Sequence, residues 1–327
     1  MMAARMHDGA EAAQGQEHER VLELAMRSNP SSPEESTGFD DLTAHQGTVA
    51  TALPTAAPIV ERIYRHRLPV RISHWLNVPC LIILIMSGLQ IFNAHPALYW
   101  GDRSDRDQSL LSIRPMKTES GEVRGITTIL GHKFDTTGVL GYSDGSRRAF
   151  PAWATVPSYK SLAMGRQWHL FFAWLLVING LFFMAYALIS RHVTRDLAPT
   201  GNDLRGIGKA VKDHLVLRHS TGHEAKRYNV LQKLAYVVIL FVVAPLIILT
   251  GLTMSPTIDT AFPWLLTIFA GRQAARTIHF IACFSFVGFI VIHVLQVIVT
   301  GFFNNMRSMV TGWFVVKQEH EGASDEA

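Results

Sequence analysis

The chain has 327 residues, of which 48% are hydrophobic and only 17% are charged. Because an ordinary soluble domain carries about 25% charged residues, this composition argues against a disordered protein and against a simple cytosolic enzyme. The formal net charge is +4, but the basic residues lie beside long hydrophobic runs. This pattern indicates membrane topology and no nucleic-acid partner.

Residues 1–58 are rich in Ala, Glu, Ser, Thr, Pro and Gln, and they contain no apolar run long enough for the core of a signal peptide. Such a segment cannot bury enough apolar surface to fold. The sequence therefore predicts a disordered cytoplasmic tail without a cleaved export signal, a membrane domain at residues 59–313 and a short cytoplasmic tail at residues 314–327.

Four long apolar runs follow, and none of them contains Asp, Glu, Lys or Arg: Trp75–Phe92, Leu170–Ile189, Leu234–Leu252 and His279–Thr300. A helix needs about 20 such residues to cross about 30 Å of hydrocarbon. We therefore expect an all-α membrane protein, a four-transmembrane-helix bundle with helices at about 74–92, 170–189, 234–252 and 279–300. Pro245 predicts a kink in the third helix.

Basic residues in the connections predict the orientation of the helices. Four arginines precede the first helix, and nine Lys and Arg residues lie between the second and third helices. The connection from the third to the fourth helix carries only Arg272 and Arg276. Because positive charge is retained in the cytoplasm during insertion, both termini are expected on the cytoplasmic side.

The connection between the first and second helices, about residues 95–165, is too long to be a simple connector. Asp144-Gly145 lies between short apolar stretches and predicts a small hairpin. We expect this long outer loop to form a compact extramembrane cap with little chemistry of its own. The segment Ala261–Gly271 is too short to span a membrane and is predicted to be an interfacial helix or a re-entrant segment.

Four histidines lie in or beside the apolar runs, where ionisable side chains are costly and are functional candidates. His279 and His293 are 14 positions apart, which separates them by about 40° around a helix and about 21 Å along it. Given the alternating helix directions, His74 lies level with His293 near the cytoplasm, and His169 lies level with His279 near the outside. The sequence predicts two histidine pairs at two depths.

Two ligands at each depth favour haem over zinc. A structural zinc site needs four ligands in one tetrahedron, whereas haem iron needs two axial ligands because the macrocycle supplies the others. Cys80 and Cys283 lie in apolar runs and form no Cys-x-x-Cys-His motif, so covalent attachment is not expected. We predict two b-type haems with the four histidines as iron ligands. Hydrogen bonding between helices is the alternative role for these histidines.

Three arginines, Arg71, Arg166 and Arg276, each precede a proposed ligand by three positions. Each therefore lies one turn nearer water on roughly the same face as the ligand, where a guanidinium can pair with a haem propionate. An ordinary interfacial arginine whose head group reaches water is the alternative.

Two glycines also lie on the predicted ligand faces. Gly88 follows His74 by 14 positions and Gly180 follows His169 by 11, which places each near the depth of the other haem. A missing side chain there lets a porphyrin approach the backbone. Close helix packing is the alternative explanation for either glycine.

Four sequence motifs surround these residues: Arg-Ile-Ser-His74, Gly-Arg-Gln-Trp-His169, Tyr228–Tyr236, and Arg276-Thr-Ile-His279 with His293 fourteen positions on. They resemble the bacterial di-haem cytochrome b subunits of nickel-iron hydrogenases, formate dehydrogenases and thiosulfate reductases. The resemblance covers about residues 64–313. The stretch His95–Gly101 and the long outer loop look most like the thiosulfate-reductase branch, whose partners are often molybdopterin enzymes.

The resemblance implies a subunit of the bacterial inner membrane that carries electrons between a redox partner outside and the quinone pool, with the four histidines as axial ligands. No residue has to act as a general acid or base, so no independent catalytic activity is expected. Two alternatives are a haem-free membrane anchor, which leaves the histidines unexplained, and a small transporter subunit. The absence of Asp and Glu from the four runs counts against the transporter.

Overall fold

The computed structural model describes residues 59–190 and 230–318. Three predicted features lie outside these described residues. They are the N-terminal tail at residues 1–58, most of the basic connection between the second and third helices, and the last part of the C-terminal tail.

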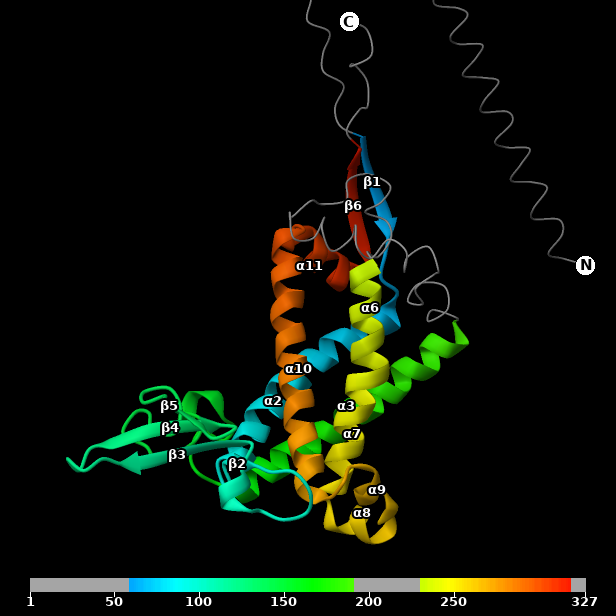
Figure 1. Cartoon of the computed structure of the whole chain (residues 1–327). Helices are drawn as coiled ribbons and strands as arrows, with labels where there is room; N and C mark the ends of the chain where they lie inside the picture. The colour runs from blue at the N-terminus through cyan, green and yellow to red at the C-terminus, as the bar shows by residue number, and fades with distance from the viewer. Residues whose placement is uncertain (1–58, 191–229, 319–327) are drawn as a thin grey trace, which may run out of the picture. The chain divides into compact units, whose positions relative to one another are not determined.

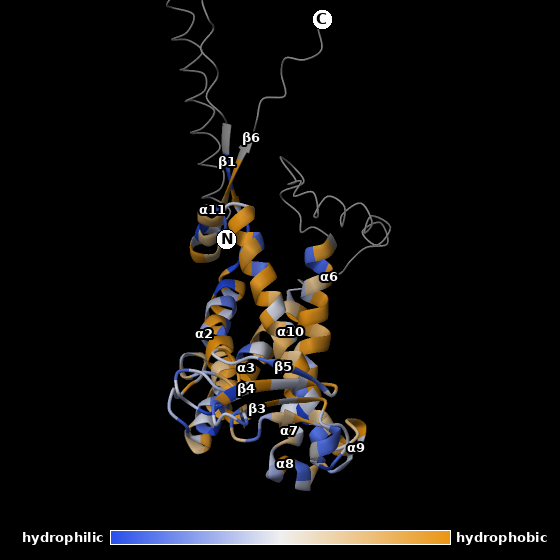
Figure 2. Cartoon of the chain, turned by 60° about the vertical axis from the view of Figure 1, so that its left-hand side comes forward, coloured by the Kyte–Doolittle hydropathy of each residue, from blue (hydrophilic) through white to orange (hydrophobic). Residues whose placement is uncertain are grey.

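Four helical segments of the described chain are long and apolar enough to cross a membrane, which confirms the predicted fold class (Figures 1 and 2). They are α2 (Leu68–Phe92), α3 (Leu162–Ile189), the combined segment Leu231–Thr253, and α10 (Arg272–Val299). All four segments begin earlier than their apolar runs, because the helix includes a preceding turn with a basic residue: Arg71, Arg166, Lys233 or Arg276. Phe171 and Leu181 on α3 are each 66% exposed, so these side chains face lipid and the chain is an integral membrane protein.

The third span contains the irregularity that Pro245 predicts. It consists of α6 (Val230–Val238), the π-helical turn η5 (Ile239–Val243) and α7 (Ala244–Thr253). A proline inside a helix lacks an N–H donor and clashes with the preceding turn. The wider π-helical turn directly before Pro245 accommodates that clash, a recognised cause of a local bend.

The helices pack as two close pairs, with α2 along α3 and α7 along α10. Asn179 joins the first pair: its buried side-chain amide donates to the Ser73 carbonyl at 3.0 Å and to Asn77 Oδ1 at 2.7 Å. No local sequence pattern marks Asn179. A buried amide whose hydrogens are both donated holds the register of α3 against α2.

The chain between α2 and α3, here called the cap segment, carries a four-stranded antiparallel sheet in the order β2-β3-β4-β5. The predicted small hairpin at Asp144-Gly145 is a tight turn closed by an antiparallel Ser143–Ser146 bridge and by a bond from Gly141 N to the Ala149 carbonyl, but it does not contribute strands to the sheet. The sheet forms upstream of it, where residues 118–122 and Leu130-Gly131 provide the two hairpin turns. The elements of the cap segment are β2 (Ala97–Leu98), η1 (Arg106–Gln108), β3 (Leu111–Lys117), β4 (Val123–Ile129), β5 (His132–Asp135) and η2 (Ala152–Ala154).

A buried arginine attaches the cap segment to α2. Arg148 is 5% exposed and donates to Gln90 Oε1 at 2.8 Å, to Thr155 Oγ1 at 2.7 Å and to the Ser158 carbonyl at 2.6 Å. Asn93, which follows α2, exchanges two hydrogen bonds with the backbone of the cap segment. A small apolar core lies beside this network: Phe92, Leu98, Ile113, Ala149 and Phe150.

Two short helices, α8 (Pro256–Ala261) and α9 (Trp264–Ile268), occupy the connection to α10. Trp264 and Ile268 are largely exposed, which suits the predicted interfacial location. Asp259 of α8 forms an ion pair with Arg272 at the start of α10.

At the other end of α10, α11 (Phe302–Thr311) leads into β6 (Trp313–Gln318), which pairs antiparallel with β1 (Ile59–Tyr64) (Figure 1). Residues 314–318, expected to begin a tail, therefore form part of a strand. The sequence analysis missed this ribbon because its two strands lie at opposite ends of the domain. Trp75 Nε1 also donates to the Met309 carbonyl at 3.0 Å, so α2 is held against α11.

Candidate functional site

The structure brings the four histidines together in two pairs, named here by their predicted sides. In the outer pair, the ring centroids of His169 on α3 and His279 on α10 are 6.2 Å apart. In the inner pair, the centroids of His74 on α2 and His293 on α10 are also 6.2 Å apart. Each histidine pair therefore lies between the two packed helix pairs. One of its histidines is on α2 or α3, and the other is on α10.

This spacing suits one metal ion between the two rings of each pair. With metal–nitrogen bonds of about 2 Å and about 1.1 Å from ring nitrogen to centroid, two imidazoles on opposite sides of a metal have centroids about 6 Å apart. The described residues contain no group of three or more His, Cys, Asp or Glu that could hold a metal. The donor set therefore does not fit protein-ligated zinc, but it fits haem, which needs only two axial ligands.

Hydrogen bonds to Nδ1 orient both rings of the outer pair. His169 Nδ1 lies 3.2 Å from the Leu84 carbonyl and 3.1 Å from Ser87 Oγ. With Nδ1 occupied, Nε2 remains available as a ligand, and this is how proteins usually orient metal-binding histidines. Ser87 is fully buried, so water does not compete for this contact.

His279 is held in the same way by α7. Its Nδ1 lies 3.0 Å from the Ile247 carbonyl and 3.2 Å from Thr250 Oγ1. The sequence analysis missed both hydroxyl residues. The available signal was the repeated pattern Leu-Ile-Met-Ser-Gly88 in α2 and Ile-Ile-Leu-Thr-Gly251 in α7.

Glycines contact both outer rings. A Cβ atom on Gly88 would lie 3.4 Å from His169 Cε1, and one on Gly251 would lie 3.3 Å from His279 Cε1. The structure thus places Gly88 beside His169 and Gly251 beside His279, and a role of Gly88 at a haem stays a prediction. Around Gly180, the described residues leave open space within 4 Å.

The inner pair has a different environment. His74 Nδ1 is buried and has no hydrogen-bond partner among the described residues, while the Phe289 ring stacks on His293 at 5.7 Å. A buried ring nitrogen without a partner costs free energy. The described residues alone therefore leave His74 Nδ1 without a partner, as expected where a bound group completes the site.

The three candidate arginines have different surroundings. Arg276 donates to the Ala97 carbonyl at 3.0 Å and to the His95 carbonyl, and Arg71 donates to the Val310 carbonyl. The acceptors are backbone carbonyls of the cap segment and of α11, and the pairing of these arginines with propionates stays a prediction. Arg166 is exposed at the start of α3, where its head group is accessible.

The stretch His95–Gly101 caps the helix that carries two of the histidines. The Gly101 carbonyl accepts hydrogen bonds of 3.0 Å from the first-turn N–H groups of Gln273 and Ala274. Asp102 Oδ1 accepts from Arg272 N at 3.2 Å, and Thr277 Oγ1 donates to the Tyr99 carbonyl at 2.7 Å. The bonds to Arg272, Gln273 and Ala274 satisfy backbone donors that a helix leaves unpaired at its start. Together with the Thr277 bond, they hold the first two turns of α10, directly before His279.

Replacing Gly271 with alanine is expected to break this cap. Gly271 has a φ of 104°, and a Cβ atom there would overlap Asp102 Oδ1. Gly301 has a similar φ of 103° but open space around it, so Gly301→Ala is the matched control. Both variants acquire backbone strain, and Gly271→Ala is expected to lose about 2 kcal/mol more because the cap is displaced. Thermal unfolding in detergent measures the difference; equal loss in both variants contradicts it.

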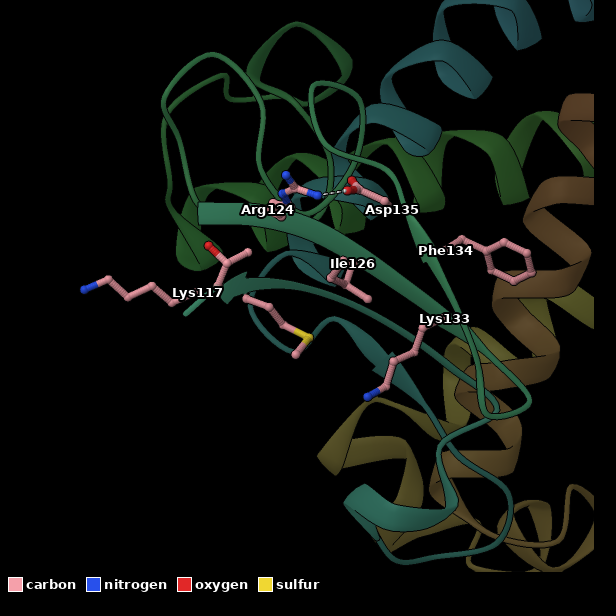
Figure 3. Close-up of a pocket in the computed structure, with 8 residues that line it drawn as sticks. Lys117, Arg124, Ile126, Lys133, Phe134 and Asp135 are labelled. Atoms are coloured by element: carbon pink, nitrogen blue, oxygen red, sulfur yellow. Dashed lines mark hydrogen bonds and ion pairs between the residues drawn. The ribbon is translucent and has the colours of Figure 1, made fainter. Parts of the chain in front are cut away.

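A hollow of about 350 Å³ lies on the sheet of the cap segment, between β3, β4 and β5 (Figure 3). Arg124 and Asp135 form an ion pair of 3.4 Å on its wall. Hydrogen bonds from Thr137 hold the pKa of Asp135 below its ordinary value, which keeps the carboxylate ionised. None of the four histidines lines this hollow, so it is separate from the paired sites.

The comparisons agree with the geometry. A family model described as prokaryotic cytochrome b561 matches residues 65–312, a range that includes all four histidines. A putative protein-methionine-sulfoxide reductase subunit YedZ1 from Azospira oryzae is 26% identical over 231 residues, which are 70% of this chain and 87% of that protein. No solved structure matches the chain. The family match and the four spanning helices identify the chain as a member of the prokaryotic cytochrome b561 family, membrane-bound b-type cytochromes that transfer electrons.

Proposed function

We propose that this protein is a di-haem cytochrome that passes electrons between the quinone pool and a redox enzyme on the outer side of the membrane. The observation that carries the proposal is the pair of 6.2 Å histidine separations at the two ends of α10. His169 and His279 would hold the outer haem, and His74 and His293 the inner one. When bound, each haem supplies a one-electron iron couple.

The chain's own residues would orient and insulate the two groups. The histidines of each pair would hold one iron, and the surrounding apolar side chains would exclude water and lower the local dielectric. Arg166 is the arginine we assign to a propionate of the outer haem, since its exposed head group is one turn from His169. The cap segment then separates the outer pair from the aqueous phase.

The orientation completes the proposed route. The basic residues before α2 and between α3 and α6 favour cytoplasmic termini in a bacterial inner membrane, so the cap segment would face the periplasm. There it would contact the partner enzyme, while quinone would exchange electrons near the inner pair from the surrounding lipid. The relative from Azospira oryzae is named as a subunit of a putative reductase, which supports an oxidoreductase partner. We favour a molybdopterin enzyme of the thiosulfate-reductase type.

Alanine variants of the four histidines test the proposal. The wild-type protein, purified in detergent, is expected to bind two haems and to give a b-type α band in the reduced-minus-oxidised spectrum. His169→Ala and His279→Ala are each expected to lose one haem, with identical residual spectra, and His74→Ala and His293→Ala to lose the other. His132→Ala, at an exposed position in β5, is the control that keeps both.

Other outcomes distinguish the alternatives. A wild-type protein without a b-type α band would be a haem-free anchor or a transporter subunit. If the two alanine variants of one histidine pair, such as His169→Ala and His279→Ala, retain different haems, the proposed pairing of the histidines is wrong. Co-purification of the tagged protein from native membranes identifies the partner, and recovery without any oxidoreductase would contradict the proposed route.

A further inference from the structure

Two matching groups of residues hold the outer histidines, and they are called the outer triplets here. One consists of Leu84, Ser87 and Gly88 on α2, and the other of Ile247, Thr250 and Gly251 on α7. In each, a carbonyl, a hydroxyl and a glycine at positions i, i+3 and i+4 lie on one helix face. Each triplet faces a histidine of the neighbouring packed helix.

The bonds to Nδ1 are protected from water. Ser87 and Thr250 are both 0% exposed, so their hydroxyls have no competing solvent partner. A neutral imidazole that binds a metal through Nε2 carries its single N–H on Nδ1. That N–H can be shared by the carbonyl at 3.0–3.2 Å and the hydroxyl at 3.1–3.2 Å. Donation from Nδ1 makes Nε2 a stronger electron donor and fixes the ring plane.

The inner pair lacks such an arrangement in the described part of the chain. His74 Nδ1 is buried without a hydrogen-bond partner there, and His293 makes ring contacts with Phe289 and His74. The same ligand type is therefore placed in two different hydrogen-bonding environments at the two depths. A stronger donor ligand stabilises the ferric state of iron relative to the ferrous state.

We propose that Ser87 and Thr250 are positioning residues that lower the reduction potential of the outer haem selectively, so that the two haems of this protein are tuned separately by hydrogen bonds to their ligands. This inference rests on the proposed function. Each hydroxyl contacts an imidazole and also donates within its own helix, Ser87 Oγ to the Leu84 carbonyl at 3.2 Å and Thr250 Oγ1 to the Leu246 carbonyl at 2.7 Å. They would therefore act on the haem through the histidine rings. The couple that they shift is one-electron reduction of iron, in which no covalent bond forms or breaks.

An optical redox titration of the purified protein, with both haems bound, tests the proposal. Ser87→Ala and Thr250→Val remove the hydroxyls, and each is expected to raise the ferrous-to-ferric ratio of the outer haem at fixed potential about threefold, a shift of about 28 mV at 59 mV per tenfold. The inner haem is expected to titrate unchanged. The haem lost in His169→Ala identifies which component is the outer one.

Three further variants separate tuning from a structural role. Ser87→Thr and Thr250→Ser keep a hydroxyl, so the outer haem is expected to retain the wild-type reduction potential in both. Thr253→Val removes a buried hydroxyl of α7 that donates to the Thr250 carbonyl at 2.6 Å, without touching His279, and is expected to leave both potentials unchanged. The low-spin electron paramagnetic resonance signal of the outer haem is also expected to change in Ser87→Ala and Thr250→Val, because ring orientation sets it.

The failure of this inference differs from the failure of the proposed function. If the protein binds two haems but both potentials are unchanged in Ser87→Ala and Thr250→Val, the tuning role is wrong and the cytochrome stands. If both haems shift equally, or Thr253→Val shifts the outer haem as much, the effect is structural and the selectivity is wrong. If the wild type binds no haem, the proposed function is wrong and the inference fails with it.

Discussion

Replacing Gly88 or Gly251 with leucine is expected to reduce bound haem from two equivalents to one. A Cβ atom added at Gly88 would lie 3.4 Å from His169 Cε1, and one added at Gly251 would lie 3.3 Å from His279 Cε1. The further atoms of leucine extend toward the space between two rings whose centroids are 6.2 Å apart. Because packed interiors do not yield to added volume, the outer haem is excluded and the inner haem is retained.

Haem quantification with low-temperature spectra measures this effect. Alanine at Gly88 or Gly251 adds only one methyl group near the limit of ordinary contact, so both haems are expected to remain, with a perturbed outer spectrum. Ser285→Leu places similar bulk at an exposed position of α10 and is the control. Loss of the inner haem in Gly88→Leu, or full retention of both haems, contradicts the assigned position of these glycines.

Arg148→Met is expected to destabilise the cap segment by about 3 kcal/mol. The methionine leaves the Gln90, Thr155 and Ser158 acceptors of the buried guanidinium without their donor. Burial lowers the pKa of Arg148, but a guanidinium remains charged in proteins. Three neutral oxygens therefore stabilise this buried cation. Removing it is expected to weaken the attachment of the cap segment to α2.

Limited proteolysis of the cap segment and thermal unfolding measure this loss. Arg124→Met is the matched control, since its ion pairs with Glu122 and Asp135 are about half exposed and such surface pairs contribute at most about 1 kcal/mol. The inner pair is remote from Arg148 along α2, so its haem is expected to stay bound. Equal protease sensitivity of the two variants would show that Arg148 is not the anchor.

The spanning helices and the two depths were predictable because they depend on local and periodic properties. Twenty uncharged apolar residues are enough to form a membrane span, and helix geometry converts the 14 positions between His279 and His293 into a distance. The predicted spans agree with the described helices apart from the turns before each uncharged run, as for α3, which begins at Leu162 and not at Leu170. The same periodicity singled out Gly88, which lies beside His169 in the structure.

The strands of the cap segment and the arginine contacts were not predictable in this way. The guanidinium of Arg276 donates to carbonyls about 180 positions earlier in the chain, and a local sequence pattern does not predict such a contact. The Asp144-Gly145 turn was recognised, but the strands formed elsewhere because strand pairing depends on cross-strand neighbours. Thr250 and Gly251 were missed because their significance depends on the packing of α7 against α10.

The sequence by itself determined the membrane character, the four spans and the family resemblance, because hydrophobicity and helical period are properties of neighbouring residues. Only the tertiary structure decided that the histidine rings face each other at 6.2 Å, and that the outer triplets hold one pair while His74 Nδ1 has no described partner. These contacts join residues on different helices, and their distances depend on how the helices pack. Residue periodicity sets the depth of a side chain, but packing sets its partners.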